Sequence, residues 1–441
     1  MGTDLKRIGE RARKEPGLVF TSLYHHICDV DNLRTCYDKL EANKATGVDG
    51  VTKKEYGINH EENLQNLSQR LKQMGYKPKP KRRSYIPKEG SEKGRPLGIS
   101  CFEDKIVEEA TKRTLEPIYE TIFKNSSYGY RPLQNQHKCL DALGQTIQQK
   151  KINYIVEADI RGFFDTVNHK WMIKFLKYRI GDERLTRLII RMLKGGLMED
   201  GLFYETREGT QQGSILSPLL ANIYLHYVLD IWFAGRVRKQ SSGKAYYFRY
   251  ADDYVACFQY KDDAESFQEQ MKNRLKGFGL EPAEEKTRCI EFGRFARVDA
   301  YKQGEKPEEF TFLGFTHYCG KTREGYFKVK RKTSRKKLGQ SLHRFTDWAR
   351  NMRNILKKGE MLKQARNKVL GHLDYYAITD NLERCKFYVR RAAQILFKWL
   401  NRKSQRRAYT WERFNKALAW IKWPEARLRK DLNPCRRAEA I

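Results

Sequence analysis

The spacing of apolar residues changes along this 441-residue chain, and the changes predict where strands and helices lie. Aromatic and β-branched residues fill two short stretches, 246–258 and 155–160, which is typical of buried strands. Helical spacing appears over residues 102–123 and 262–278, and again in three stretches beyond residue 330. Strands and helices alternate without the regular βαβ rhythm of a parallel sheet. The pattern therefore predicts an α+β fold built around an antiparallel sheet.

Two adjacent carboxylates, Asp252 and Asp253, interrupt the apolar run 246–258, so the pattern predicts a hairpin with these acids at its tip. Asp is a common turn residue, and the alternative is that both acids only form a solvated turn. A third acid, Asp159, ends the second strand-like run. Three carboxylates that converge on one sheet suit a pair of Mg²⁺ ions, which prefer hard oxygen ligands. We therefore predict that these three aspartates are metal ligands and catalytic residues.

Two Mg²⁺ ions in such a site can activate a 3′-hydroxyl, orient it towards an α-phosphate and stabilise the departing pyrophosphate. The same ligands would serve a nuclease, so the acids alone do not decide between making and cutting a phosphodiester. Residues 84–99 predict two strands joined by a turn, with Lys88 and Arg95 near its tip. Cations placed there can hold a triphosphate and favour synthesis. The alternative is that both are solvated surface charges.

Three further features bear on nucleotide binding. Gln212 and Gly213 lie in a glycine-punctuated loop, where the backbone can approach a base or a sugar. Phe164 lies five residues beyond Asp159, close to the expected ribose, where its ring would collide with a 2′-hydroxyl; the alternative is a plain core residue. Lys286 is placed to protonate the departing pyrophosphate, although a surface lysine fits the same pattern.

The charge of the chain is strongly positive and unevenly distributed. The formal net charge is +33, and residues 321–441 alone hold 34 Lys and Arg against 10 Asp and Glu. Helical stripes there begin with Leu338, Leu342, Phe345, Trp348 and Met352, and a later helix has Thr410 as its predicted N-cap. Basic helices of this kind suit the phosphate backbone of a nucleic acid, and the alternative is a solvated basic surface.

The nine cysteines are scattered singly, with no Cys-x-x-Cys and no zinc-type spacing, so we expect small buried side chains in a reducing compartment. The sequence has no apolar run long enough for a membrane span and no secretory signal pattern. These observations predict a cytoplasmic protein that associates with nucleic acid.

Several motifs, taken in order, carry a family resemblance. They resemble the successive blocks of bacterial group II intron-encoded reverse transcriptases over roughly residues 40–320. The motifs are residues 45–50, 85–88, 94–99, 127–132, 157–169, 209–218, 250–253, 286–287 and 312–315. An ordered set of this kind is far more specific than any single block.

The resemblance implies a right-hand polymerase with fingers, palm and thumb. Residues 1–150 would form an N-terminal extension and fingers with the first part of the palm, residues 151–325 the palm, and residues 326–441 a basic helical thumb and maturase region. The three aspartates would be catalytic, with the carbonyl of Ile160 as a further metal ligand. Lys88 and Arg95 would contact the triphosphate, and Phe164 would select deoxynucleotides.

The implied function is an RNA-directed DNA polymerase that uses two Mg²⁺ ions to add dNTPs to a DNA primer on an RNA template. It would also bind intron RNA and assist its splicing in group II intron retrohoming. The alternative is a free-standing relative that acts in phage defence or DNA repair. The sequence leaves open the identity of the RNA partner, the oligomeric state, the fidelity and the processivity.

Two departures from the family pattern change the expectation. Gln211 stands where the family usually has proline, so the loop loses one fixed φ angle while Gln212 and Gly213 are kept. After the basic helices we find neither a Cys-rich nor a His-Asn-His nuclease segment, so we expect intron mobility without a self-made DNA nick. Nascent strands at replication forks or hairpins are hypothetical primers.

Overall fold

The computed structural model describes residues 5–88, 91–402 and 409–435, without the side chains of residues 87–93. The chain forms two compact units. The first contains residues 1–136, 158–254 and 265–288, and the second contains residues 137–157, 255–264 and 289–441.

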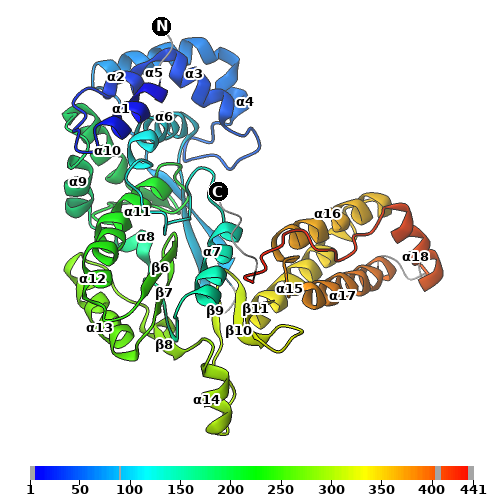
Figure 1. Ribbon diagram of the computed structural model, residues 1–441. Helices are drawn as coiled ribbons and strands as arrows, with labels where there is room; N and C mark the ends of the chain where they lie inside the picture. Colours follow the sequence, from blue (N-terminus) through cyan, green and yellow to red (C-terminus); the bar gives the residue numbers. More distant parts are fainter. Residues whose placement is uncertain (1–4, 89–90, 403–408, 436–441) are drawn as a thin grey trace. The chain divides into compact units, whose positions relative to one another are not determined.

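Both units are rich in helices (Figure 1). The α-helices are α1 (Leu5–Lys14), α2 (Tyr24–Cys28), α3 (Val30–Lys39), α4 (Lys53–Tyr56), α5 (His60–Lys72), α6 (Phe102–Tyr119), α7 (Gln136–Gln149), α8 (Phe163–Thr166), α9 (His169–Lys177), α10 (Glu183–Leu193), α11 (Ser217–Leu225), α12 (Arg238–Gln240), α13 (Lys261–Gly277), α14 (Ala296–Lys302), α15 (Arg335–Met352), α16 (Lys358–Tyr376), α17 (Leu382–Asn401) and α18 (Trp411–Trp420). Short 3₁₀ or π-helical turns are η1 (Gly57–Asn59), η2 (His226–Asp230), η3 (Phe233–Val237) and η4 (Glu284–Lys286).

The strands form three sheets with the orders β2-β1-β4-β5, β6-β7-β3-β8 and β11-β10-β9. Their bounds are β1 (Lys81–Lys88), β2 (Ser91–Ile99), β3 (Tyr154–Ala158), β4 (Leu197–Glu199), β5 (Leu202–Tyr204), β6 (Ala245–Tyr250), β7 (Asp253–Phe258), β8 (Arg288–Glu291), β9 (Phe310–Phe312), β10 (Phe315–Lys321) and β11 (Phe327–Thr333). Antiparallel pairs join β1 to β2, β4 to β5, and β10 to both β9 and β11. The α+β prediction with antiparallel sheets is confirmed, and β1 with β4 adds a parallel pair.

In the first unit, an amphipathic helix pattern anchors the N-terminal helices. Leu64, Leu67 and Leu71 recur at helical spacing in α5 and are fully buried. The short helix α4 begins with a reciprocal capping box between Thr52 and Glu55, which satisfies free backbone donors at the start of the helix. Local sequence signals therefore define these helices, and buried leucines fix them in place.

The sheet β6-β7-β3-β8 carries the acids predicted from the sequence. Its strand β7 is buried from Tyr254 to Phe258, as expected of a continuous apolar run. The boundary between the two compact units passes through β3, β7 and β8. The predicted division into fingers, palm and thumb, with bounds at residues 150 and 325, describes functional segments. The two compact units do not test it, so it stays a prediction.

The second unit contains the basic helices. Leu338 and Phe345 of α15 are buried in one hydrophobic core with residues of α16, α17 and α18, and these helices lie together in Figure 1. The predicted N-cap is confirmed, because the Thr410 side chain accepts a hydrogen bond from the backbone N–H of Arg413 at 3.3 Å. The predicted basic thumb and maturase region, residues 326–441, includes Lys403, Arg406 and Arg407, which lie outside the described residues.

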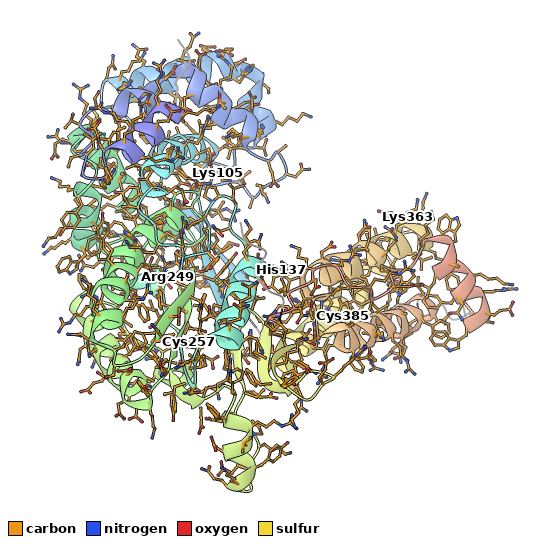
Figure 2. All side chains as sticks on the ribbon, in the orientation of Figure 1. Lys105, His137, Arg249, Cys257, Lys363 and Cys385 are labelled. Atoms are coloured by element: carbon orange, nitrogen blue, oxygen red, sulfur yellow. The ribbon has the colours of Figure 1, made fainter. Side chains whose placement is uncertain are left out.

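Most of the cysteines are buried, as predicted, including Cys257 in β7 and Cys385 in α17 (Figure 2). The prediction is wrong for Cys435, which is exposed, and for Cys289, which is half-buried. Both lie at positions where the sequence has no periodic apolar pattern to predict burial. Within the described part of the chain, no helix is long and apolar enough to cross a membrane.

Candidate active site

Asp159 directly follows β3, at the point where the chain meets a returning segment. Its backbone carbonyl accepts a hydrogen bond from the N–H of Ala283 at 2.9 Å, and the N–H of Arg161 donates to the carbonyl of Glu281 at 2.8 Å. These bonds bring the turn η4 beside Asp159, and Lys286 in that turn donates to the Asp159 carboxylate. This hydrogen bond raises the pKa of Lys286. The structure therefore brings together two predicted site residues that are 127 positions apart in sequence.

The hairpin predicted around the paired acids is present. Strand β6 ends at Tyr250 and β7 begins at Asp253, so Ala251 and Asp252 form the turn between them. Ala251 has a positive φ of 58°, which L-residues rarely adopt. The hydrogen bond to Asp159 is the main cause of the raised pKa of Lys286, and the charge of Asp253 contributes a smaller effect in the same direction. The tight turn places two successive carboxylates, Asp252 and Asp253, at the tip of the hairpin.

The electrostatics of Asp252 connect the hairpin to the other predicted residues. Burial raises the pKa of its carboxyl, and the negative charge of Asp159 raises it further, whereas the cations Arg95 and Lys286 act in the opposite direction. Arg95 lies opposite Ile86 in the hairpin of β1 and β2. The two acids and the two cations are therefore close enough to interact. The side chain of Lys88, on the same hairpin, lies outside the described residues.

The loop with Gln212 and Gly213 packs against β2 through its backbone. The Gln212 carbonyl accepts a hydrogen bond from the N–H of Gly98 at 2.7 Å. Gly213 has a φ of 106°, and a Cβ there would lie 2.9 Å from the Gly98 carbonyl oxygen. Only glycine suits this close approach. Gln211, which takes the place of the family's proline, is buried and donates to the hydroxyl of Thr206 at 2.9 Å.

Phe164 lies in α8, shortly after Asp159. Its side chain is half-buried and meets the buried ring of Phe163 edge-on at 5.4 Å between centroids. Its carbonyl accepts a hydrogen bond from the N–H of Thr210 at 2.7 Å, which ties α8 to the loop before Gln212. Ile160 is buried and forms an antiparallel bridge with Pro282. Phe164 is therefore the more accessible of two adjacent rings.

A metal site can be tested against the donor chemistry of this region. Within the described ranges, no three His, Cys, Asp or Glu side chains are grouped so that they could hold a metal ion by themselves. Mg²⁺ needs only one or two carboxylates and completes its shell with water and substrate phosphates. Burial is the main cause of the raised pKa of Asp252, and the negative charge of Asp159 adds to it, so a cation bound between the two carboxylates would offset both effects. These residues fit a divalent ion.

Two residues that the sequence reasoning missed lie beside the hairpin. Tyr130 is exposed, and it directly follows Gly129, where a Cβ would lie 2.3 Å from the backbone nitrogen of Ala251. Arg249 is fully buried in β6 and hydrogen-bonds the turn itself. The signal for Arg249 was present in the sequence, because an arginine within an aromatic strand run is rarely buried without a specific partner.

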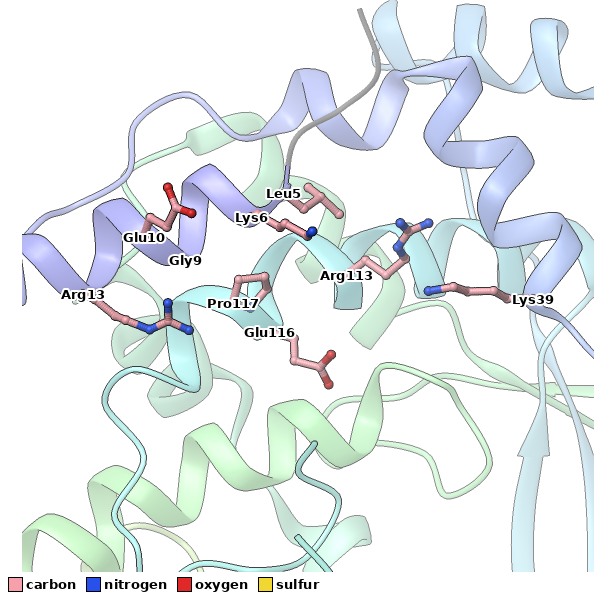
Figure 3. Close-up of a pocket in the computed structure, with 9 residues that line it drawn as sticks. All are labelled: Leu5, Lys6, Gly9, Glu10, Arg13, Lys39, Arg113, Glu116 and Pro117. Carbon is pink, nitrogen blue, oxygen red and sulfur yellow. The ribbon is translucent and has the colours of Figure 1, made fainter. Parts of the chain in front are cut away.

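A cavity of about 500 Å³ lies elsewhere in the first unit, between α1 and α6 (Figure 3). Its lining combines cations with two acids and contains none of the predicted site residues. It is lined by Leu5, Lys6, Gly9, Glu10, Arg13, Lys39, Arg113, Glu116 and Pro117. The candidate active site is therefore defined by the carboxylates and not by this cavity.

The comparison with known proteins agrees with this geometry. The family described as reverse transcriptase (RNA-dependent DNA polymerase) matches residues 86–317, more than half of the chain. The chain therefore belongs to the reverse transcriptase family, whose members generally use divalent metals. The matched segment contains the two carboxylate sites, the β1–β2 hairpin from Ile86 onward and the loop with Gln212.

Individual relatives confirm the resemblance to group II intron reverse transcriptases and maturases. The chain is 38% identical over 222 residues to the Group II intron-encoded protein LtrA of Lactococcus lactis subsp. cremoris, covering 50% of this chain and 37% of LtrA. It is 33% identical over 260 residues to protein YkfC of Escherichia coli (strain K12), covering 52% and 68%. It is 29% identical over 228 residues to the putative COX1/OXI3 intron 2 protein of Saccharomyces cerevisiae, covering 51% and 26%. The match thus spans little more than a third of LtrA.

Proposed function

We propose that this protein is an RNA-directed DNA polymerase that extends a DNA primer on an RNA template with dNTPs. The observations that carry the proposal are the family match over residues 86–317 and the contact of Lys286 with the Asp159 carboxylate. Burial raises the pKa of Asp252, and the charges of Asp159, Arg95 and Lys286 also act on it. Carboxylates at the centre suit metal ions that activate the 3′-hydroxyl of the primer. Cations at the edge suit the triphosphate of the incoming dNTP. The acids alone would also serve a nuclease, and the family match to reverse transcriptases favours synthesis.

Asp159, Asp252 and Asp253, with the carbonyl of Ile160, would hold two Mg²⁺ ions. When bound, the ions supply Lewis-acid activation of the 3′-hydroxyl and charge stabilisation at the reacting phosphate. The chain's own cations act on the other end of the nucleotide. Arg95, together with Lys88, orients the triphosphate and offsets its charge.

Lys286 is placed for proton transfer. Its ammonium is held by the Asp159 carboxylate, which keeps it protonated. A protonated amine beside the metal ligands can pass a proton to the departing pyrophosphate oxygen. Asp159 then has two functions, since it also serves as a metal ligand.

The sugar and base are positioned by Phe164 and the loop of Gln212 and Gly213. Phe164 is half-buried and lies five residues after Asp159, and its ring would exclude a 2′-hydroxyl from the sugar site. The loop hydrogen-bonds both α8 and β2, so the sugar-selecting ring and the strand with Arg95 share one support. In a right-hand polymerase these parts belong to the palm and the fingers.

We further propose that the protein binds group II intron RNA and assists its splicing. The relatives named above include a group II intron-encoded protein and an intron protein, and residues 321–441 carry the excess of basic residues. The helices α15 to α18 supply a thumb and maturase surface for the phosphate backbone. The partners are then intron RNA or another RNA template, a DNA primer or target, and dNTPs.

Primer extension tests the polymerase proposal. Wild-type protein with an RNA template, a DNA primer, dNTPs and Mg²⁺ is compared with Asp252→Ala and with Asp262→Ala, an exposed acid in the first turn of α13. We expect Asp252→Ala to lower extension by at least about a hundredfold, because it removes transition-state charge stabilisation. RNA binding should stay within a few-fold, and the Asp262 variant should match wild type.

Extension that survives Asp252→Ala would rule out the metal assignment. Loss of RNA binding in the same variant would instead indicate a folding defect, which a thermal unfolding curve detects. A splicing assay distinguishes this function from the alternative, a free-standing polymerase in defence or repair. An intron-encoded protein should accelerate splicing of its flanking group II intron RNA in vitro, whereas a free-standing polymerase should not accelerate the splicing of such an RNA.

A further inference from the structure

Arg249 is a charged side chain with no access to solvent. It lies on β6, three residues before Asp252 (Figure 2), and its exposed fraction is 0%. Its guanidinium donates twice to the carboxylate of Asp230, at 2.8 and 2.6 Å, and once to the side-chain oxygen of Asn222 at 2.9 Å. A further hydrogen bond, at 3.0 Å, reaches the backbone carbonyl of Ala251. One guanidinium thus joins two residues of the α11–η2 segment to the turn of the hairpin.

The other side of the turn is closed by the segment before Arg131. The backbone of Arg249 accepts from the N–H of Tyr128 and donates to the carbonyl of Ser126, each at 2.8 Å. The Asn222 amide donates to the carbonyl of Gly129 at 2.7 Å. A Cβ on Gly129 would lie 2.3 Å from the backbone nitrogen of Ala251, so this segment lies directly against the turn.

A buried ion pair is a costly way to fill a core. Removing two charges from water costs free energy that a pair of well-packed apolar side chains does not incur. Packing alone therefore does not explain Arg249 and Asp230. What an apolar pair lacks is a donor for the Ala251 carbonyl, and Ala251 is the residue held at the unfavourable φ of 58°.

We propose that Arg249, fixed by Asp230 and Asn222, is a positioning residue that sets the backbone of the Ala251–Asp252 turn and so aims the Asp252 carboxyl at the reacting centre. Asp230 holds the guanidinium by two parallel hydrogen bonds, which fix its plane as well as its place. We call Arg249, Asp230 and Asn222 the clamp, and all three side chains are buried. Nδ1 of His226, which is also buried, lies 3.8 Å from the Asp230 carboxylate. The inference rests on the proposed role of Asp252.

The test uses the full-length protein with three clamp variants. Arg249→Lys keeps the positive charge. Its single nitrogen cannot make the two parallel hydrogen bonds to Asp230 and also donate to the Ala251 carbonyl with the geometry of a guanidinium. Arg249→Met alone leaves Asp230 buried and unpaired, and is expected to unfold more easily. Arg249→Met/Asp230→Val removes both charges and replaces them with an apolar pair, so the fold is retained while the donor to the turn is lost.

Three measurements are made on each variant: thermal unfolding, steady-state primer extension, and Mn²⁺ binding followed by electron paramagnetic resonance. For the double variant we expect unfolding close to wild type, a KM for dNTP within about threefold, and a kcat lowered on the order of 100-fold, the cost of a misplacement of about 1 Å. Mn²⁺ binding should weaken without substrate present. Arg249→Lys should recover part of the lost kcat.

A matched control is Lys328→Met/Asp380→Asn, which neutralises a partly buried ion pair in the second unit. It should change unfolding without a selective fall in kcat. A folded double variant of the clamp with kcat and Mn²⁺ binding near wild type would overturn the positioning role. If Asp252→Ala also left extension intact, the proposed function itself would fail, so the two failures are distinguishable.

Discussion

Two adjacent phenylalanines, Phe163 and Phe164, differ in how deeply their side chains are buried. Phe163 is 2% exposed and packs its ring against Tyr224 as well as Phe164. Phe164 is only half-buried, and its backbone carbonyl accepts a hydrogen bond from the N–H of Thr210, in the loop that leads to Gln212. The sequence alone left both a core role and a sugar-selecting role open for Phe164, and its partial exposure favours the second.

Phe164→Val should admit ribonucleotides. The smaller side chain removes the steric conflict with a 2′-hydroxyl, so we expect the preference for dNTP over rNTP, measured as a ratio of kcat/KM, to fall by roughly tenfold or more. Phe163→Val is the matched control, since it creates a core cavity and should lower thermal stability with the sugar preference unchanged. Equal sugar preference in wild type and Phe164→Val would remove this residue from the nucleotide site.

Single residues differ in how far the sequence could predict them. Asp252 and Asp159 were predictable because each ends an apolar run, a pattern that is visible without tertiary structure. The partnership of Arg249 with Asp230 was not, because a buried ion pair between a strand and a π-helical turn has no periodic signature. Cys435 was predicted to be buried and is exposed, because no periodic apolar pattern around it indicates which way its side chain faces.

At the scale of elements, the loop of residues 209–213 is supported at both ends. The N–H groups of Gly209 and Thr210 donate to carbonyls of the α8 region, and the Gln212 carbonyl accepts from β2. Two of its glycines, Gly209 and Gly213, have positive φ and would place a Cβ within 3.0 Å of backbone oxygen. Backbone contacts therefore fix both ends of the loop, and they leave no room for a side chain at Gly209 or at Gly213.

Gly213→Ala should reduce extension by moving the loop away from Gly98. The alanine Cβ would lie 2.9 Å from a backbone oxygen and would also force an unfavourable φ of 106°. Gly201→Ala is the matched control, because it has a positive φ of 83° but nothing within 4 Å. Gly201→Ala should lose about 1 kcal/mol of stability through its φ angle alone, Gly213→Ala should lose more because its Cβ also meets a backbone oxygen, and only Gly213→Ala should raise the KM for dNTP. A similar KM in the two variants would contradict a role for this loop in nucleotide binding.

Elements with a strong local signal were predicted well from the sequence. The helices α6 and α13 and the hairpin of β6 and β7 all lie where apolar spacing placed them. The parallel pairing of β1 with β4 was not anticipated, since Arg82 and Met198 are brought together only by the tertiary fold. Strand partners of this kind depend on packing between distant segments, which periodicity does not encode.

At the scale of the whole molecule, the net charge of +33 is the dominant property. Helix α15 begins with Arg335, Lys336 and Lys337 and has no acid in its first turn. Cations at a helix N-terminus oppose the helix dipole and cost roughly 0.3–1 kcal/mol each. A basic first turn is therefore unfavourable for the helix itself, which is consistent with a role in binding a polyanion.

RNA binding should depend steeply on salt. If six or more phosphates are contacted, affinity should fall by about a thousandfold between 50 and 200 mM salt. The variant Arg335→Gln/Lys336→Gln/Lys337→Gln should flatten the plot of log affinity against log salt concentration by about two to three units of slope, with thermal stability unchanged or higher.

The control neutralises three exposed cations that are already paired with acids, Arg11, Lys44 and Lys177. It should leave the slope nearly unchanged. Equal slopes for the two triple variants would mean that the first turn of α15 does not contact RNA.

The long separation between Asp159 and Lys286 has a consequence for synthesis on the ribosome. The 127 positions that separate them take roughly 6–25 s to translate at 5–20 residues per second. A nascent chain has its first carboxylate at the start of that interval, gains the hairpin acids Asp252 and Asp253 within it, and gains the lysine only at its end. The candidate site therefore cannot be completed before residue 286 has been synthesised.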